Sequence, residues 1–165
     1  MELWFSTLTL LTAQRTSKTT GRLLFRFRVL EEYLTSLRSF AGGAQAAAHD
    51  LCTSWAMLTV SAPGLWQSTG LTRSLNVTYL SQAHAGDVLT MDCEVSLWDL
   101  GVFHGGLEAF FDLVADILSL HVPFQILQSG KKLAIVRGTL RREDGTIVST
   151  CEHHKYNHDS SQARL

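Results

Sequence analysis

What this 165-residue chain lacks restricts its function before any motif is considered. Its 14 lysines and arginines balance 15 aspartates and glutamates, and no basic cluster marks a nucleic-acid surface. No apolar run approaches the roughly 20 residues of a membrane-spanning helix, so no membrane span is expected. The cysteines are far apart without a C-x-x-C pair, which indicates a reducing compartment and neither a zinc site nor a disulfide framework. They are Cys52, Cys93 and Cys151.

Alternation of apolar and polar residues predicts strands in several segments. The segments are 8–14, 23–29, 75–79, 89–94, 133–141 and 146–155. The N-terminus has no acidic residue between Glu2 and Glu31, as in a mitochondrial transit peptide, but its alternation favours a strand. Asp144-Gly145 is a hairpin signal between the last two strands. Two strands, a long helix and four strands predict an α+β domain in which an antiparallel sheet wraps one helix.

The predicted helix covers residues 42–58, and Asp50 is its single formal charge. A helix with so little charge is typically buried. A carboxylate in such a helix is costly unless it is paired or used. Gly42 and Gly43, at the helix start, leave backbone N–H groups free to bind a ligand oxygen. The segment is therefore either a core helix whose Asp50 is satisfied by backbone donors, or an oxyanion site with an acid or base.

Several segments, in their order and spacing, are similar to those of a known family. They are Gly21 to Val29, Glu31-Glu32, Gly42-Gly43 to Asp50, Leu75 to Leu80, Gly86-Asp87 to Glu94, Gly130 to Ala134 and Thr150 to His153. The chain resembles the hotdog-fold acyl-coenzyme A thioesterases of the phenylacetate-pathway type, which include small mitochondrial and many fungal members. The resemblance implies an α+β hotdog fold and thioester hydrolysis, with no cofactor and no metal expected.

The resemblance also implies the roles of individual residues. The amides of Gly42 and Gly43 would stabilise the oxyanion of the thioester, Asp50 would act as general base or nucleophile, and Thr72 would orient the water. Lys131 and Lys132 would meet phosphates of coenzyme A, or serve as solvated hairpin charges. The expected substrate is an acyl-coenzyme A or acyl-carrier thioester, in fungal lipid or polyketide metabolism, in the cytosol or mitochondrion.

Such a site requires a second subunit. Asp50 follows Gly42 by eight residues, about 12 Å along a helix, so it does not reach a carbonyl held at the start of its own helix. In the family, two protomers pair with continuous sheets and antiparallel helices, and the Asp of one faces the glycine turn of the other. A homodimer or homotetramer with two equivalent sites per C2 dimer is expected.

Three positions depart from the family pattern. The usual His before the glycine pair is Ala41, and Thr35 and Arg38 replace the family's Asn and Gly. Weakened or redirected activity is expected, and the alternative is a non-catalytic acyl-thioester-binding protein. His49, next to Asp50, is interpreted as structural because adjacent helix residues do not face each other. The histidines near the C-terminus are interpreted as strand-end residues; they are His153, His154 and His158.

Residues 95–125 interrupt the resemblance within a single domain of residues 1–165. Joining Glu94 directly to Ile126 restores what reads as the family's hairpin. Val95-Ser96 can be encoded GTAAGT and Phe124-Gln125 TTTCAG, like intron boundaries, so we hypothesise a translated intron. Two alternatives are a lid with an amphipathic helix at 107–120, and a second glycine motif at His104-Gly105-Gly106 followed by Asp112.

Overall fold

The computed structural model describes residues 7–63, 66, 68–97 and 133–157. These residues form one six-stranded antiparallel sheet and one long helix. The elements are β1 (Thr9–Arg15), β2 (Thr20–Arg28), the 3-10 helix η2 (Glu31–Tyr33), α1 (Gly42–Ala56), the 3-10 helix η3 (Met57–Val60), β3 (Leu71–Tyr79), β4 (Val88–Leu97), β5 (Leu133–Arg142) and β6 (Ile147–Tyr156). The strand order is β1-β2-β4-β5-β6-β3, so β1 and β3 are the edges. The predicted α+β hotdog fold is confirmed.

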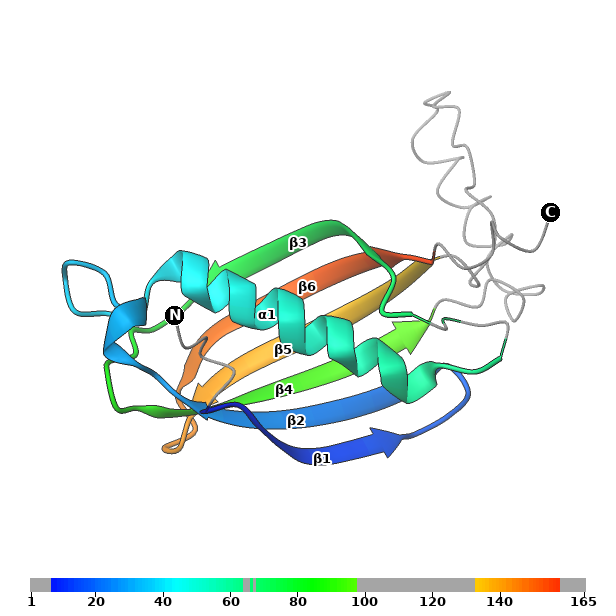
Figure 1. Cartoon of the computed structure of the whole chain (residues 1–165), viewed down its shortest axis with the longest axis horizontal. Helices are drawn as coiled ribbons and strands as arrows, with labels where there is room; N and C mark the ends of the chain where they lie inside the picture. The colour runs from blue at the N-terminus through cyan, green and yellow to red at the C-terminus, as the bar shows by residue number, and fades with distance from the viewer. Residues whose placement is uncertain (1–6, 64–65, 67, 98–132, 158–165) are drawn as a thin grey trace, which may run out of the picture.

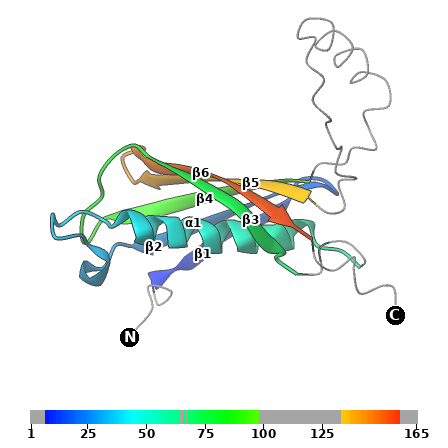
Figure 2. The ribbon, with the colours of Figure 1, turned by 90° about the horizontal axis from the view of Figure 1, so that it is seen from above.

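The sheet curves around α1 because one face of each central strand is apolar. Helix α1 runs across the inner face of the sheet (Figure 1), and the view from above shows the strands bending around it (Figure 2). In β2 and β4 every second side chain is buried beneath α1. These side chains are Leu23, Phe25, Phe27, Leu89, Met91, Cys93, Val95 and Leu97. Apart from Leu24, the outward positions between them are polar or charged, as the alternation predicts.

Small residues bring α1 close to the sheet. Ala48, Cys52 and Ala56 are fully buried on the helix face that meets the strands. Opposite them, Gly138 of β5 has no side chain, and a Cβ there would lie 2.8 Å from His49 Nδ1 and 2.9 Å from Cys151 Sγ. No side chain fits in that space without a shift of its neighbours. The helix and the sheet therefore approach each other more closely than larger side chains would allow.

Strand β4 continues into the segment that interrupts the family resemblance. Val95, Ser96 and Leu97 pair with Val136, Ile135 and Ala134 of β5. Val95 and Leu97 are buried, because they extend the period-two pattern of Cys93. The hypothesised insertion thus begins inside a strand. Its remaining residues, 98–125, lie outside the described residues, and so do the alternatives placed at 104–112 and 107–120.

Two deletions of equal length test whether this segment belongs to the folded domain. Removing residues 95–125 puts Ile126, Leu127 and Gln128 in the places of Val95, Ser96 and Leu97. Removing residues 98–128 keeps β4 and leaves Ser129 to Lys132 as a four-residue hairpin loop, a common length. We expect both shortened chains to fold, with the second unfolding at the higher temperature because Leu97 stays buried.

Thermal unfolding followed by circular dichroism measures the outcome for the two deletions. Loss of cooperative unfolding in both variants would show that residues 98–125 are a structural element and would contradict the intron hypothesis. Sequencing of the mature transcript tests the same hypothesis directly, because a translated intron is absent from correctly spliced messages.

Candidate functional site

Asp50 meets two polar side chains from neighbouring strands. The Thr72 hydroxyl on β3 donates to Asp50 Oδ1 at 3.1 Å. His153 on β6 places Nε2 3.5 Å from the same carboxylate oxygen and 3.0 Å from Thr72 Oγ1. The Asp50 side chain is 50% exposed, whereas the His153 side chain is fully buried. The three residues come from three elements and form one compact polar group at the middle of α1.

Thr53 determines which nitrogen of His153 carries the proton. Its hydroxyl lies 2.5 Å from the carbonyl oxygen of His49, one turn earlier, and donates its single proton there. The Thr53 oxygen lies 2.7 Å from His153 Nδ1 and therefore accepts a proton from it. We infer from this network that a neutral His153 is protonated at Nδ1 and presents the Nε2 lone pair to Thr72 and Asp50.

This tautomer leaves one proton for two acceptors. Nε2 of His153 and Oδ1 of Asp50 both face the Thr72 hydroxyl, which carries one hydrogen. The Thr72 proton can bond to only one of these two acceptors at a time. A hydrogen-bond donor beside them, such as a water molecule, would bond to the other acceptor. The group is therefore suited to bind and deprotonate a water, because it offers two lone pairs within reach of one position.

Burial keeps the histidines of this region neutral. It lowers the pKa of His153 to about 4, and the positive charge of Lys155 acts in the same direction. The pKa of His49 is also lowered to about 4, mainly by burial. His49 Nε2 lies 2.9 Å from the Ser149 hydroxyl, and its buried Nδ1 has no hydrogen-bond partner in the described part of the chain. His49 is thus a core residue, in agreement with the structural role expected for it.

A buried lysine lies one helical turn beyond Asp50. Lys155 of β6 is 2% exposed, and its ammonium donates to Ser54 Oγ at 2.7 Å. Burial lowers the pKa of Lys155, and the negative charge of Asp50 opposes that shift. Sequence reasoning did not identify Lys155, nor did it connect His153 with Asp50. The available signal was the period-two spacing of Cys151, His153 and Lys155, which places all three on one face of β6.

The start of α1 is open, as the glycine pair predicts. The helix begins at Gly42, and its N-cap residue Ala41 makes no side-chain cap. The first N–H groups of a helix have no partner within the helix. Nothing lies within 4 Å of the position that a Cβ on Gly43 would occupy. Tyr79 of β3 packs against the first turn of α1 beside Gly42, and its hydroxyl donates to the carbonyl oxygen of Gly42 at 2.9 Å.

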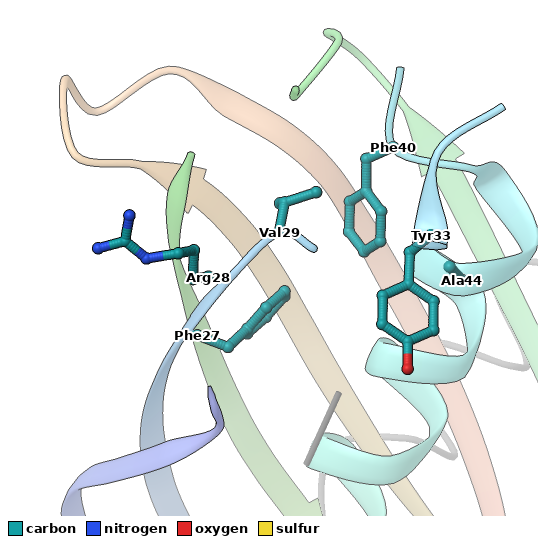
Figure 3. A pocket seen from close by; sticks show the side chains of 6 residues that line it. All are labelled: Phe27, Arg28, Val29, Tyr33, Phe40 and Ala44. Carbon is teal, nitrogen blue, oxygen red and sulfur yellow. The ribbon is translucent and has the colours of Figure 1, made fainter. Parts of the chain in front are cut away.

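A small apolar cavity adjoins this first turn. Phe27 of β2 and Val29, which directly follows the strand, face Tyr33, Phe40 and Ala44 across it, and Arg28 points away to the other side of the strand (Figure 3). Its volume is about 10 Å³, the space of one water-sized group. Because Ala44 directly follows Gly43, a group bound at the helix start has a narrow apolar space beside it.

The predicted site residues fall into three sets. Asp50 and Thr72 are in contact. Gly42 and Gly43 lie at the beginning of the same helix as Asp50, eight and seven residues away, so one subunit does not bring them together with the carboxylate. Lys131 and Lys132 lie outside the described residues.

No group of three His, Cys, Asp or Glu side chains suited to a metal ion occurs within residues 7–63, 66, 68–97 and 133–157. Of the histidines near the C-terminus, His154 has Nε2 2.8 Å from Glu152, and His158 lies outside the described residues. Among the helices of the described part, none is long and apolar enough to cross a membrane.

Acidification tests the burial of the two histidines. An unfolded histidine has a pKa near 6.5, whereas His49 and His153 have folded values of about 4. Between these values the unfolded chain binds more protons, so the free energy of unfolding should fall as the pH is lowered, by up to about 1.4 kcal/mol per pH unit for each histidine. Urea unfolding between pH 6.5 and 5 measures this slope, and His153→Gln should reduce it. A free energy of unfolding that stays constant over this range would contradict the assignment.

Comparison with known proteins supports the fold. No model of a protein family matches the chain, and no curated protein matches it. Thioesterase superfamily member 2 from zebrafish has a similar solved structure, with a TM-score of 0.62 and 18% identity over 92% of this chain and 81% of that chain.

Two bacterial structures are also similar. A hypothetical thioesterase from Streptococcus pneumoniae, solved with coenzyme A, has a TM-score of 0.63 and 14% identity over 93% of this chain and 87% of that chain. The PaaI protein of the phenylacetic acid degradation operon of E. coli has a TM-score of 0.58 and 13% identity over 91% of this chain and 78% of that chain. The chain therefore has the hotdog fold of these thioesterase structures.

Proposed function

We propose that this protein hydrolyses acyl thioesters of coenzyme A or of an acyl carrier. The observation that carries the proposal is the contact of Asp50, on the central helix of a hotdog fold, with Thr72 and the neutral His153. Structures of similar fold are described as thioesterases, one of them with coenzyme A, and a further similar structure, from Streptococcus mutans, is bound to acetyl-CoA. These likenesses support the substrate class, and the polar group around Asp50 supports the chemistry.

In the proposed reaction a water molecule binds between Asp50 Oδ1 and His153 Nε2, with Thr72 orienting it. Asp50 takes a proton as the water oxygen bonds to the thioester carbonyl carbon. The carbonyl oxygen becomes an oxyanion beside the amides of Gly42 and Gly43 at the positive end of α1, where each donor is typically worth about 3 kcal/mol. When the tetrahedral intermediate collapses, the C–S bond breaks, the thiolate takes up the proton, and the acid and thiol leave.

The site is proposed to form between two copies of the chain. Strand β3 is a nine-residue strand that, among the described residues, pairs only with β6, and it contains no proline or lysine to block further pairing. Pairing of two β3 edges would continue the sheet and set the helices antiparallel. Asp50 of one subunit would then face Gly42 and Gly43 of the other. Tyr79, near the end of this edge and bonded to Gly42, would lie at the boundary.

A non-catalytic acyl-thioester-binding protein is the second candidate, because one observation favours it. Ala41 precedes the glycine pair and provides no side-chain hydrogen bond, whereas the family pattern has a histidine there. Such a protein would use the same fold and cavity but would release no thiol. Turnover therefore separates the two candidates.

The place of the reaction is also a proposal. Cys52, Cys93 and Cys151 are buried free thiols, which supports a reducing compartment such as the cytosol or the mitochondrial matrix. Burial raises the pKa of Cys52 and of Cys151 to about 12, so these thiols are protonated and unreactive. A role in fungal lipid or polyketide metabolism rests on the family resemblance.

Replacing Asp50 by Asn tests the catalytic role. The amide keeps an oxygen that accepts from Thr72 but removes the basicity, so kcat should fall by about 10² to 10⁴-fold. Thiol release from a panel of acyl-coenzyme A thioesters measures the rate, and calorimetry with the same ligands measures binding. Glu32→Gln, a charge removal on an exposed residue of η2, is the matched control and should retain the rate. Full turnover by the Asp50 variant would show that Asp50 is structural; binding without turnover by the unmodified chain would favour the binding protein.

Mixing two inactive variants tests the shared site. Gly42→Val places a branched side chain where even a Cβ would lie 3.4 Å from the Tyr79 ring, and Asp50→Asn removes the base. Each variant alone should be inactive. After subunit exchange, a mixed dimer should contain one intact site, so about a quarter of the original activity should return in an equal mixture at random pairing. Exchange demonstrated by mass spectrometry without any recovered activity would contradict the shared site.

A further inference from the structure

The outer face of the sheet carries arginines that the proposed reaction does not use. Arg26 and Arg28 alternate with the buried Phe27 in β2, so both leave the strand on the side away from α1. Arg141 of β5 lies on the same row, because Arg26 pairs with Thr90 of β4 and Thr90 pairs with Arg141. Within the described residues none of the three arginines has an ion pair. In contrast, Arg22 on the same face of β2 pairs with Asp92.

Two of these arginines line a groove. It has a volume of about 360 Å³ and lies at the end of the sheet where β2 stops and β4 begins. Arg26 and Arg28 line it together with Thr7, Thr9, Phe27, Val88 and Glu143. Successive outward positions on a strand are about 7 Å apart, and Arg141 begins two strands away from Arg26, about 10 Å. The groove is therefore lined by two arginines, and a third, Arg141, lies on the same row of the outer face.

The charge of this region selects a multiply charged anion. Three arginines against the one carboxylate of Glu143 leave a net charge of +2. Guanidinium groups bind phosphate oxygens through two parallel N–H donors, and they remain charged at any physiological pH. The hydroxyl of Thr9, in register with Arg26, adds a neutral donor at the rim. A phosphate-bearing ligand satisfies these groups better than a single carboxylate does.

We propose that the groove at Arg26, Arg28 and Arg141 binds the phosphate groups of a small ligand. If the proposed function is correct, the phosphates are those of coenzyme A, and this identification of the ligand rests on that function. A free phosphorylated metabolite is the other possible ligand with phosphate groups. The position of Arg28 favours coenzyme A. It follows Phe27 and precedes Val29, two residues of the cavity beside the first turn of α1, and it points to the opposite side of the strand (Figure 3).

This arrangement divides the ligand between the two faces of the sheet. A thioester at Gly43 would lie on the inner face, and the nucleotide would pass around the end of β2 to the outer face. The predicted phosphate contacts at Lys131 and Lys132 precede Leu133, the first residue of β5, whereas the arginine groove lies where β5 ends.

Calorimetric titration at low ionic strength tests the groove without requiring turnover. The probes are inorganic pyrophosphate and adenosine 3′,5′-bisphosphate, added to the full chain. The double variant Arg26→Gln/Arg28→Gln should bind both about tenfold more weakly or not at all. Lys18→Gln, on an exposed residue of the turn between β1 and β2 at the far end of β2 from the groove, also removes a positive charge and should bind as the unmodified chain does. Added salt should weaken the binding, because exposed charges are screened.

Steady-state kinetics distinguish coenzyme A from a free phosphorylated metabolite as the ligand of the groove. For an acyl-coenzyme A substrate the double variant should show a KM raised about tenfold with kcat unchanged, whereas an acyl N-acetylcysteamine thioester, which has no phosphate, should show no difference. An unchanged KM together with arginine-dependent pyrophosphate binding would identify a free phosphorylated compound as the ligand.

The two proposals fail separately. If no thioester is hydrolysed but pyrophosphate binding still depends on Arg26 and Arg28, the proposed function is wrong and the phosphate-binding role of the groove is supported. Absence of saturable pyrophosphate and bisphosphate binding, or equal binding by the double variant, would overturn the groove. Binding of an acidic carrier protein without binding of either phosphate probe would overturn it as well.

Discussion

The close contact between α1 and the inner face of the sheet is the constraint on which the other features depend. The helix presents alanines and Cys52, and β5 presents Gly138, so the two layers meet without large side chains between them. At that separation the short hydroxyls of α1 reach polar groups on β6: Thr53 contacts His153, and Ser54 contacts Lys155. Larger residues at the contact would move the helix away and separate these pairs.

Polar groups under a helix are costly unless each has a partner, and here most have one. His49 pairs with Ser149, His153 with Thr53 and Thr72, and Lys155 with Ser54. Asp50 differs because its carboxylate is half exposed. The network beneath it is therefore buried and hydrogen-bonded, while its carboxylate is accessible from outside. That combination is typical of a preorganised site, in which charges do not have to be rearranged during the reaction.

The sequence predicted the fold well because burial follows alternation. The segments 23–29 and 133–141 correspond closely to β2 and β5. The segment 75–79 captured only the second half of β3, since an irregularity between Thr72 and Ser74 breaks the alternation there. Thr72 was identified through the family resemblance and not through its own pattern.

The contacts of the site were less accessible from sequence. Alternation places His153 and Lys155 on the inner face of β6, but it does not determine which turn of α1 lies opposite them. That position depends on the register of five strand pairs and on the packing of small residues, which no local segment encodes. For the same reason, the sequence alone does not show that Arg26 and Arg141 lie on one row of the sheet. Their alignment depends on β4, which pairs with β2 on one side and with β5 on the other.

The surplus of acceptors around Thr72 has a further consequence for the balance of protons. At neutral pH, hydrolysis of a thioester yields an ionised acid and a thiol, so each cycle delivers one proton to the solvent. His153 Nε2 and Asp50 Oδ1 lie 3.5 Å apart with Thr72 bridging them, so a proton taken from water can be held between them without movement of any backbone. In the proposed reaction that proton then passes to the departing thiolate, and the exposed side of Asp50 leaves the proton of the carboxylic acid product a direct route to bulk water. In the proposed reaction the site would thus hold a proton temporarily between a buried hydrogen-bond network and the solvent.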